Sequence, residues 1–210
     1  MSVKTSQSLL QEAKHDPQSE AWFQLNSIYD PLISGWIVRA GVEESEVGDI
    51  TQEVLQTLAQ DLSKFEHNGR VGAFRNWLKT ITIHRCRRYW DKKKKRSNDQ
   101  SLNSNAGIHV LNELEDPCSD FSVLWDKEHD DFVFEKILEL IRNEFEPQVF
   151  EIFVRNTIEG DSPKLLASQF GITIGNIYKI KFRVLKRLRK AAEGLLDGPS
   201  LSGKSDPEIR

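Results

Sequence analysis

The stretch from Pro163 to Lys181, PKLLASQFGITIGNIYKIK, most constrains the fold, because it predicts two short helices joined by a tight turn. Ser162 can accept a hydrogen bond from the free amides of a first helical turn, and Pro163 suits the first helical position. Gly171 can adopt the left-handed conformation that ends a helix, and Thr173 can cap the next one. The pattern is typical of a helix-turn-helix.

The packing residues of this motif support that interpretation. Ala167, Gly171 and Ile177 stand at relative offsets of zero, four and ten, which places a small residue where the helices cross and an apolar one in their core. Further apolar residues surround them: Leu166, Phe170, Ile172 and Ile180. The alternative, an ordinary helical hairpin in an all-α core, gives no reason for a basic outer face.

We expect the second helix to enter the major groove of DNA by its N-terminal turns. Its outward residues there are Ile174, Gly175, Asn176, Tyr178, Lys179 and Arg183. Asn176 could pair with adenine and Lys179 with guanine, whereas Lys186, Arg187 and Arg189 lie further along, where phosphates are the expected target.

Charge is segregated along the chain, so the formal net charge of -3 is an average over opposite blocks. Residues Lys79 to Arg96 hold nine basic side chains and one acidic one, and Asp161 to Lys190 hold eight and one. Because physiological salt screens charges beyond about 10 Å, a phosphate backbone responds to the local block. Two contacts with nucleic acid follow, unless each block is simply a solvated helix end.

The 210 residues favour two small helical domains, and 38% hydrophobic with 29% charged residues favours a globular chain. Apolar residues at helical spacing predict two helices between Ser19 and Leu62, with Pro31 kinking or breaking the first, and a third from Phe74. Helical spacing returns at Phe121–Phe145 and Pro147–Glu159. The expected all-α architecture comprises a domain at 18–96, a flexible acidic linker at 97–129, a helix-turn-helix domain at 130–192 and a C-terminal tail at 193–210, which is expected to be disordered from Leu195.

Several classes of function find no support in the sequence. It has no apolar run of membrane-spanning length and no signal-peptide core, which predicts a cytoplasmic protein. Cys86 and Cys118 are far apart and predict neither a disulfide nor a zinc site. No nucleophile arrangement, phosphate-binding glycine loop or cofactor fingerprint is present, so we expect no enzyme, no cofactor, no metal and no small-molecule substrate.

The helix around Ile50 has a second notable face. An apolar stripe of Val47, Ile50, Val54 and Leu58 leaves a polar set on another side. This set, Asp49, Gln52, Glu53 and Gln56, is acidic and rich in amides. It would suit a basic partner surface, although exposed polar faces are usual on surface helices.

Three segments, in this order, resemble the small extracytoplasmic-function type of bacterial sigma factor. DITQEVLQTLAQDLSKF (Asp49 to Phe65) and GAFRNWLKTITIHRCRRYWDKKKKR (Gly72 to Arg96) are similar to the domain that binds polymerase and melts promoters. IEGDSPKLLASQFGITIGNIYKIKFRVLKRLRK (Ile158 to Lys190) is similar to the C-terminal promoter-reading domain.

The resemblance implies roles for particular residues. Asp49, Gln52 and Glu53 match a motif that contacts the largest subunit of core RNA polymerase, and Gln56 extends that face. The loop Glu66 to Ala73 matches the segment that captures a flipped base of the minus-ten element. The residues implied in minus-ten contacts are His67, Asn68, Arg70, Arg75, His84, Arg85, Arg87 and Arg88. Those implied in minus-thirty-five contacts are Thr173, Gly175, Asn176, Tyr178, Lys179, Arg183 and Lys186.

Some positions depart from the family pattern. His84 stands where members often have Asn, in the region next to the base pocket, which affects the specificity expected there. Tyr178 and Ile180 replace residues that are commonly basic or polar, which predicts an unusual sequence preference or weaker binding to phosphate. Phe74 and Trp77 could stack on bases, but their spacing favours packing in the core.

Three hypotheses of function follow. The first is a promoter-specificity subunit without catalytic activity, whose partners are core RNA polymerase, promoter DNA and, as the resemblance allows, an anti-sigma factor. The second is a stand-alone helix-turn-helix regulator whose first domain is a dimerisation or sensor module. The third is an enzyme acting on DNA, which would need clustered carboxylates or a nucleophile near the basic block, and Asp91 alone does not make that site.

Overall fold

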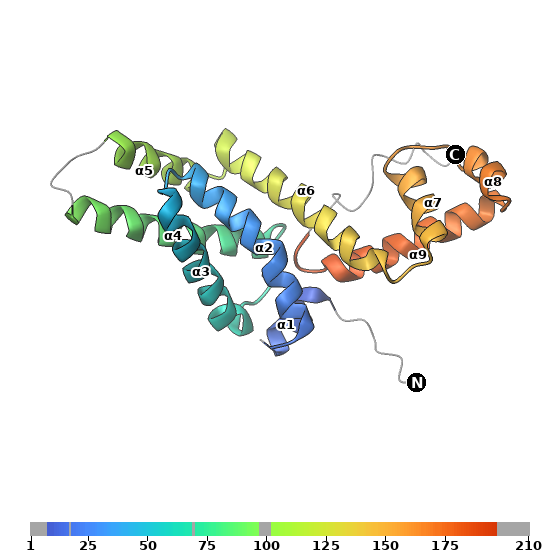
Figure 1. Ribbon diagram of the computed structural model, residues 1–210, viewed down its shortest axis with the longest axis horizontal. Helices are drawn as coiled ribbons and strands as arrows, with labels where there is room; N and C mark the ends of the chain where they lie inside the picture. Colours follow the sequence, from blue (N-terminus) through green and yellow to red (C-terminus); the bar gives the residue numbers. More distant parts are fainter. Residues whose placement is uncertain (1–7, 17, 69, 97–101, 197–210) are drawn as a thin grey trace. The chain divides into compact units, whose positions relative to one another are not determined.

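The computed structural model describes residues 8–16, 18–68, 70–96 and 102–196 (Figure 1). Within these ranges every regular element is helical, which confirms the predicted all-α class. The elements are α1 (Leu9–His15), α2 (Glu20–Arg39), α3 (Glu44–Asp61), the short 3-10 helix η1 (Leu62–Lys64), α4 (Ala73–Arg96), α5 (Leu102–Glu115), α6 (Asp120–Arg142), α7 (Pro147–Thr157), α8 (Pro163–Phe170) and α9 (Ile174–Ala192).

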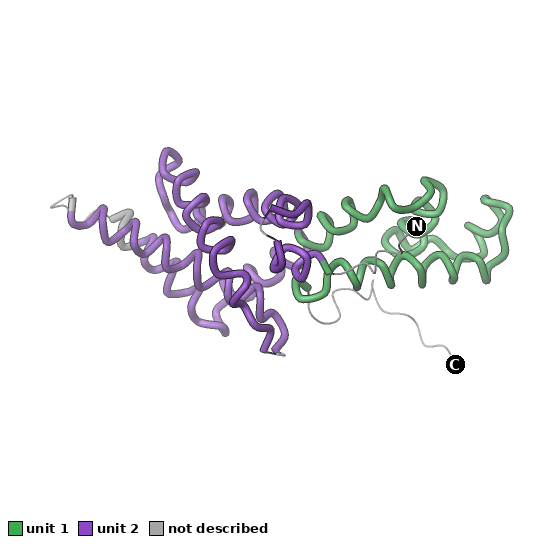
Figure 2. The backbone as a smooth tube through the Cα atoms, turned by 90° about the horizontal axis from the view of Figure 1, so that it is seen from below, with its two compact units in different colours: residues 1–8, 133–210 green, residues 9–132 purple. Residues whose placement is uncertain are grey.

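The chain divides into two compact units (Figure 2). Unit 2 comprises residues 9–132, and unit 1 comprises residues 133–210 together with residues 1–8. The division falls inside α6, so one continuous helix contributes its first part to unit 2 and its second part to unit 1.

In unit 2, α2, α3 and α4 pack in sequence around an apolar core, and α1, which the sequence did not predict, packs on α2. Helix α2 begins at Ser19, whose hydroxyl oxygen accepts a hydrogen bond from the Trp22 amide at 3.2 Å. Pro31 lies inside α2 without ending it. Large side chains that are almost completely buried fill the core: Leu25, Ile28, Tyr29, Ile33, Ile37, Leu58 and Phe74.

Unit 2 extends well beyond the predicted domain end at Arg96. Leu111 and Leu114 of α5 are 1% and 3% exposed, and the Trp125 ring of α6 lies 4.0 Å from the Trp36 ring of α2. The prediction of a linker without regular structure was therefore wrong for residues 102–115, which form α5, whereas the helical spacing predicted from Phe121 lies within α6. Residues 97–101 lie outside the described part. Packing decides the outcome here, because tertiary burial overrides the weak helix propensity of a Ser- and Asn-rich segment.

In unit 1, α7, α8 and α9 enclose a cluster of Ile152, Leu166 and Ile177. Ala167, Phe170, Ile172 and Ile180 pack against this cluster, which confirms the packing residues predicted from the motif. The predicted tail starts too early, because Leu195 and Leu196 are 2% and 3% exposed. Its remainder, residues 197–210, lies outside the described part.

Candidate nucleic-acid interface

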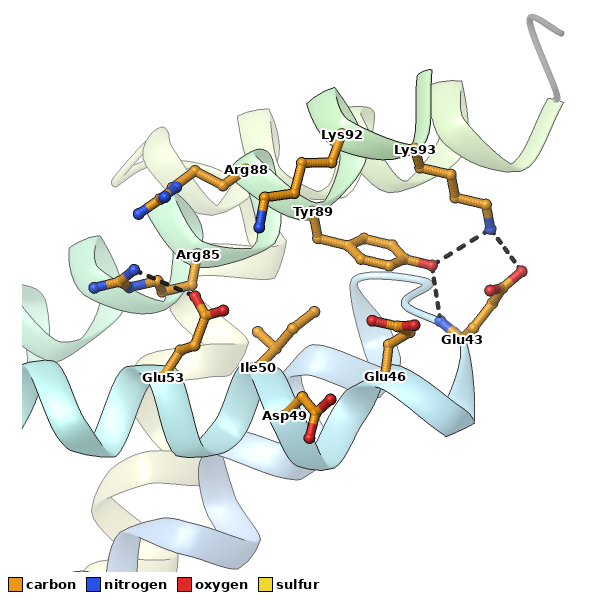
Figure 3. A pocket seen from close by; sticks show the side chains of 10 residues that line it. All are labelled: Glu43, Glu46, Asp49, Ile50, Glu53, Arg85, Arg88, Tyr89, Lys92 and Lys93. Atoms are coloured by element: carbon orange, nitrogen blue, oxygen red, sulfur yellow. Dashed lines mark hydrogen bonds and ion pairs between the residues drawn. The ribbon is translucent and has the colours of Figure 1, made fainter. Parts of the chain in front are cut away.

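A groove between α3 and α4 brings acidic and basic side chains together (Figure 3). Its volume is about 320 Å³. One side of the groove is formed by Glu43, which directly precedes α3, and by Glu46, Asp49, Ile50 and Glu53 of α3. The other side is formed by Arg85, Arg88, Tyr89, Lys92 and Lys93 of α4. The acidic face predicted on α3 therefore borders the basic run predicted on α4.

Two sets of contacts cross this groove. Arg85 donates to the Glu53 carboxylate at 3.2 Å and to the Thr57 hydroxyl at 2.6 Å. Lys93 donates to the Glu43 carboxylate at 2.7 Å and to the Tyr89 hydroxyl at 3.4 Å. The hydrogen bond from Lys93 lowers the pKa of Glu43, and the same bond raises the pKa of Lys93. The contacts hold the two helices in register at both ends of the groove.

Other charges in the groove stay available. Asp49 and Arg88 are exposed, and neither forms an ion pair with a described residue. Gln52 and Gln56 are also exposed, whereas Glu53 is half-buried beside Arg85. Of the four residues predicted to meet polymerase, three are thus open to solvent and one is engaged with a residue predicted to meet DNA.

The loop before α4 exposes His67, Asn68 and Arg70. The Asn68 side-chain oxygen accepts the Arg70 amide at 3.0 Å, a turn that shapes the loop, while residue 69 lies outside the described part. Behind the loop the Phe65 ring stacks on the half-buried Trp77 at 4.9 Å. Phe74 is fully buried, which confirms its predicted role in the core.

A different face of α4 is covered by charges from α6. Arg75, 8% exposed, contacts Asp126 at 3.0 Å and Asp130 at 2.5 Å. Lys79 contacts Asp126 at 3.0 Å and donates to the Ser122 hydroxyl at 2.8 Å. The structure therefore corrects the expectation for Arg75, because its charge is buried and neutralised within unit 2 rather than presented to DNA.

Arg87 on the same helix is also engaged. It forms an ion pair with Glu115 and donates to the Asn112 side chain at 2.9 Å, both on α5. By contrast, His84 and Arg88 remain exposed. Of the residues predicted for minus-ten contacts, the open set is His67, Asn68, Arg70, His84 and Arg88, and the engaged set is Arg75, Arg85 and Arg87.

Sequence reasoning missed the polar network between α2, α4 and α6. The Tyr29 hydroxyl lies 3.1 Å from His129 Nε2, and His129 Nδ1 lies 3.0 Å from Asp130. Burial lowers the pKa of His129, and burial also raises the pKa of Tyr29. Burial alone would raise the pKa of Asp130, but hydrogen bonds from His129 and Arg75 lower it on balance. A signal existed: Asp126 and Asp130 are four residues apart on α6, as are the cations they pair with on α4.

The two helices and the tight turn predicted in Pro163–Lys181 are present in unit 1. The Ser162 hydroxyl accepts the Leu165 amide at 3.2 Å, and the Thr173 hydroxyl accepts the Asn176 amide at 3.2 Å. Gly171 has a φ of 64°, the left-handed conformation that the turn requires. These contacts confirm the predicted start of α8, its end and the cap of α9.

All seven residues predicted to meet the minus-thirty-five element are exposed: Thr173, Gly175, Asn176, Tyr178, Lys179, Arg183 and Lys186. The Arg183 guanidinium lies 5.6 Å from the Phe145 ring centre, which supports it at the helix surface. Arg187, predicted to meet phosphate, instead forms a two-pronged pair with Glu144 at 2.6 Å for each bond.

Other kinds of site find little in the described residues. No group of three or more His, Cys, Asp or Glu side chains among them could hold a metal ion. Cys86 is buried, which raises the pKa of its thiol to about 12, and Cys118 is exposed; neither is bonded to another cysteine. Among the helices described, none combines the length and apolar character needed to span a bilayer.

Comparison with known families gives one match. Residues 27–96, about a third of the chain, match sigma-70 region 2. The match runs from within α2 to the end of α4 and so includes both walls of the groove. No curated protein matches the chain. The region 2 match supports a sigma-70 family sigma factor, and region 2 implies binding to RNA polymerase and promoter melting.

Proposed function

We propose that this chain is a sigma factor of the extracytoplasmic-function type, which binds core RNA polymerase, directs it to specific promoters and helps to melt the DNA. The match of residues 27–96 to sigma-70 region 2 carries this proposal. In it the chain acts in the cytoplasm by binding energy alone and contributes no catalytic group.

The polymerase contact is assigned to the open side of α3. Asp49, Gln52 and Gln56 are exposed there, and Asp49 has no ion pair within the described residues. An unpaired carboxylate on a surface helix need not break an existing ion pair when a basic partner approaches, so it can add favourable charge pairing. Glu53 takes part after exchanging its bond with Arg85 for one with the partner.

Minus-ten contacts are assigned to the loop before α4 and to the uncovered face of α4. His67, Asn68 and Arg70 would meet the melted strand, and His84 and Arg88 the adjoining duplex. Extruding a nucleobase from the duplex costs a few kcal/mol. The stacked aromatic side chains behind the loop, together with nearby cations, can offset that cost.

Minus-thirty-five contacts are assigned to α9. Its first turns are exposed, and its opposite face is held by the packed cluster of Ile152, Leu166 and Ile177. A helix that is fixed on one face and open on the other is the arrangement by which a helix-turn-helix presents side chains to the major groove.

A charge-reversal pair tests the proposal. Asp49→Lys reverses an unpaired charge on α3, and Asp131→Lys makes the same change on α6, where Asp131 is likewise exposed and unpaired within the described chain. Binding of each purified protein to core RNA polymerase would be measured by fluorescence anisotropy. We expect the wild type and Asp131→Lys to bind alike, and Asp49→Lys to bind at least tenfold more weakly.

Two outcomes would contradict the proposal. Equal loss in both variants would mean that net charge, rather than the α3 face, decides binding. No binding of the wild-type chain to core polymerase, combined with specific binding of the free chain to duplex DNA, would instead favour a stand-alone helix-turn-helix regulator.

A further inference from the structure

Helix α9 carries an exposed apolar stripe that the core does not use. Ile174, Tyr178 and Phe182 are 44%, 57% and 67% exposed. They follow one another at four-residue spacing and so share one side of the helix. Large apolar side chains that remain exposed in a row mark a contact surface more often than chance.

The stability of unit 1 gives no reason for this stripe. A different face of α9 is formed by Ile177, Val184 and Leu188, each 0% exposed, and these residues supply the packing. Truncating Phe182 would therefore remove little buried area. A side chain with so little role in folding is available for binding.

The surroundings of the stripe indicate which partner it meets. Lys179, Arg183 and Lys186 are exposed on the adjoining part of the outer face. Neither Lys179 nor Lys186 forms an ion pair with any residue that the structure describes. An apolar stripe next to uncompensated cations is complementary to the major groove, where apolar base substituents lie between two rows of phosphates.

Helix geometry sets the reach of the stripe. Phe182 is eight positions after Ile174, a span of about 12 Å at 1.5 Å per residue. Base pairs repeat at about 3.4 Å, so the stripe covers about three to four steps. Gly175 has no side chain on the same outer face, and a Cβ built there would meet only the Thr173 hydroxyl oxygen at 3.8 Å, which leaves room for close approach of the backbone.

We propose that Tyr178 and Phe182, with Ile174 at the helix start, read the 5-methyl groups of thymines in the minus-thirty-five element. The inference rests on the proposed function, and it adds the chemistry of the sequence preference. Thymine alone among the four bases presents a methyl group in the major groove, so apolar contact there selects it. The element is accordingly expected to hold thymines at two or three positions within about four base pairs.

Replacing thymine by uracil tests the contact directly, because it removes only the methyl group. The full chain bound to core RNA polymerase would first select duplexes from a pool with a randomised segment. The selected duplex is then made with uracil at one thymine at a time, and its affinity is measured. We expect about fourfold weaker binding at each contacted position, because uracil lacks the methyl group that thymine buries against the protein.

Variants locate the contact on the protein. Phe182→Ala and Tyr178→Ala should each make binding indifferent to one particular methyl group. Leu165→Ala is the matched control, because Leu165 is 45% exposed in the same unit but lies on α8. With Leu165→Ala every methyl effect should persist.

The outcomes separate this inference from the proposed function. If a defined sequence is selected but no uracil substitution changes its affinity, the inference alone is overturned. It is also overturned alone by methyl effects that persist in Phe182→Ala, Tyr178→Ala and Ile174→Ala, or by a loss of polymerase binding in these variants without a change in methyl effects. Failure of the complex to form or to select any sequence would overturn the proposed function and this inference together.

Discussion

Two basic helices, α4 in unit 2 and α9 in unit 1, differ in the share of their described cations that other side chains neutralise. On α4, Arg75 and Lys79 are covered by carboxylates of α6, and Arg87 pairs with α5. On α9, Lys179 and Lys186 stay unpaired within the described chain, and Arg187 is engaged. A count of basic residues therefore states the charge of a segment but not the charge that a partner can reach.

Removing α5 and α6 from unit 2 should have the largest effect on its stability. A chain of residues 1–96 lacks Trp125, Leu111 and Leu114, which are at most 3% exposed in the whole protein. Losing one large buried aromatic side chain costs about 3–5 kcal/mol. Losing all three side chains is therefore comparable to the whole stability of a small domain. We expect no cooperative urea transition for residues 1–96 and a clear one for residues 1–132. Equal midpoints would show that α5 and α6 are dispensable.

Breaking the buried ion pairs of Arg75 should lower the free energy of unfolding much more than breaking the more exposed pair of Arg187. Asp126→Ala with Asp130→Ala leaves Arg75 buried without a partner, which should lower the free energy of unfolding by about 3–5 kcal/mol. Glu144→Ala in unit 1 breaks a more exposed pair with Arg187 and should cost about 1 kcal/mol or less. Urea unfolding of the full chain, followed by tryptophan fluorescence for unit 2 and circular dichroism for both units, measures the two. Similar losses would contradict the distinction between the units.

The contact between α4 and α5 depends on a glycine. A Cβ at Gly107 would lie 2.5 Å from a ring atom of Trp90, whereas a Cβ at Gly35 in α2 would meet nothing within 4 Å. Gly107→Ala should destabilise unit 2 by about 1–3 kcal/mol through this clash. Gly35→Ala is the control and should be neutral or stabilising by up to about 1 kcal/mol, since alanine favours the helix. Thermal unfolding would show the opposite signs.

The network beneath α4 should make unit 2 sensitive to acid. Burial lowers the pKa of His129, so the unfolded chain takes up a proton near the ordinary value of 6.5 while the folded chain does not. The free energy of unfolding should therefore fall as the pH drops below about 6.5. His129→Gln should reduce this slope, and the exposed His15 serves as the control through His15→Gln. An unchanged slope in His129→Gln would assign the acid sensitivity to other groups.

The salt dependence of the proposed DNA binding should show the smallest effect. Lys186→Ala removes a cation that α9 leaves open, and it should lower the slope of log affinity against log salt by about one. Arg87→Ala removes a cation already paired with Glu115 and should leave the slope unchanged. A reduced slope for Arg87→Ala would mean that DNA displaces α5 from α4.

Local sequence signals predicted the helix-turn-helix in detail. Ser162 and Thr173 cap α8 and α9, Gly171 takes the left-handed turn, and Ile177 is 0% exposed, all as expected from residue types at short range. The α3 face and the helical spans of α2, α3, α4 and α7 were also predictable from periodicity. Such features depend on neighbours three or four residues apart, which a single sequence displays directly.

The helix α5 and the packing of α5 and α6 in unit 2 could not be predicted in the same way. Gly107 beneath Trp90, and Trp125 on Trp36, join residues that are far apart in the chain. Arg75 was predicted to contact DNA because its own segment is basic, and only the packing of α6 showed that Asp126 and Asp130 neutralise it.

By itself, the sequence determined the helical character of α2, α3, α4 and α6 to α9, where the turn of unit 1 lies and that charge is divided into blocks. Backbone conformation and capping are local, so they follow from adjacent residues. Only the tertiary structure decided where unit 2 ends and which cations remain open, because burial and ion pairing depend on side chains that folding brings together from distant positions.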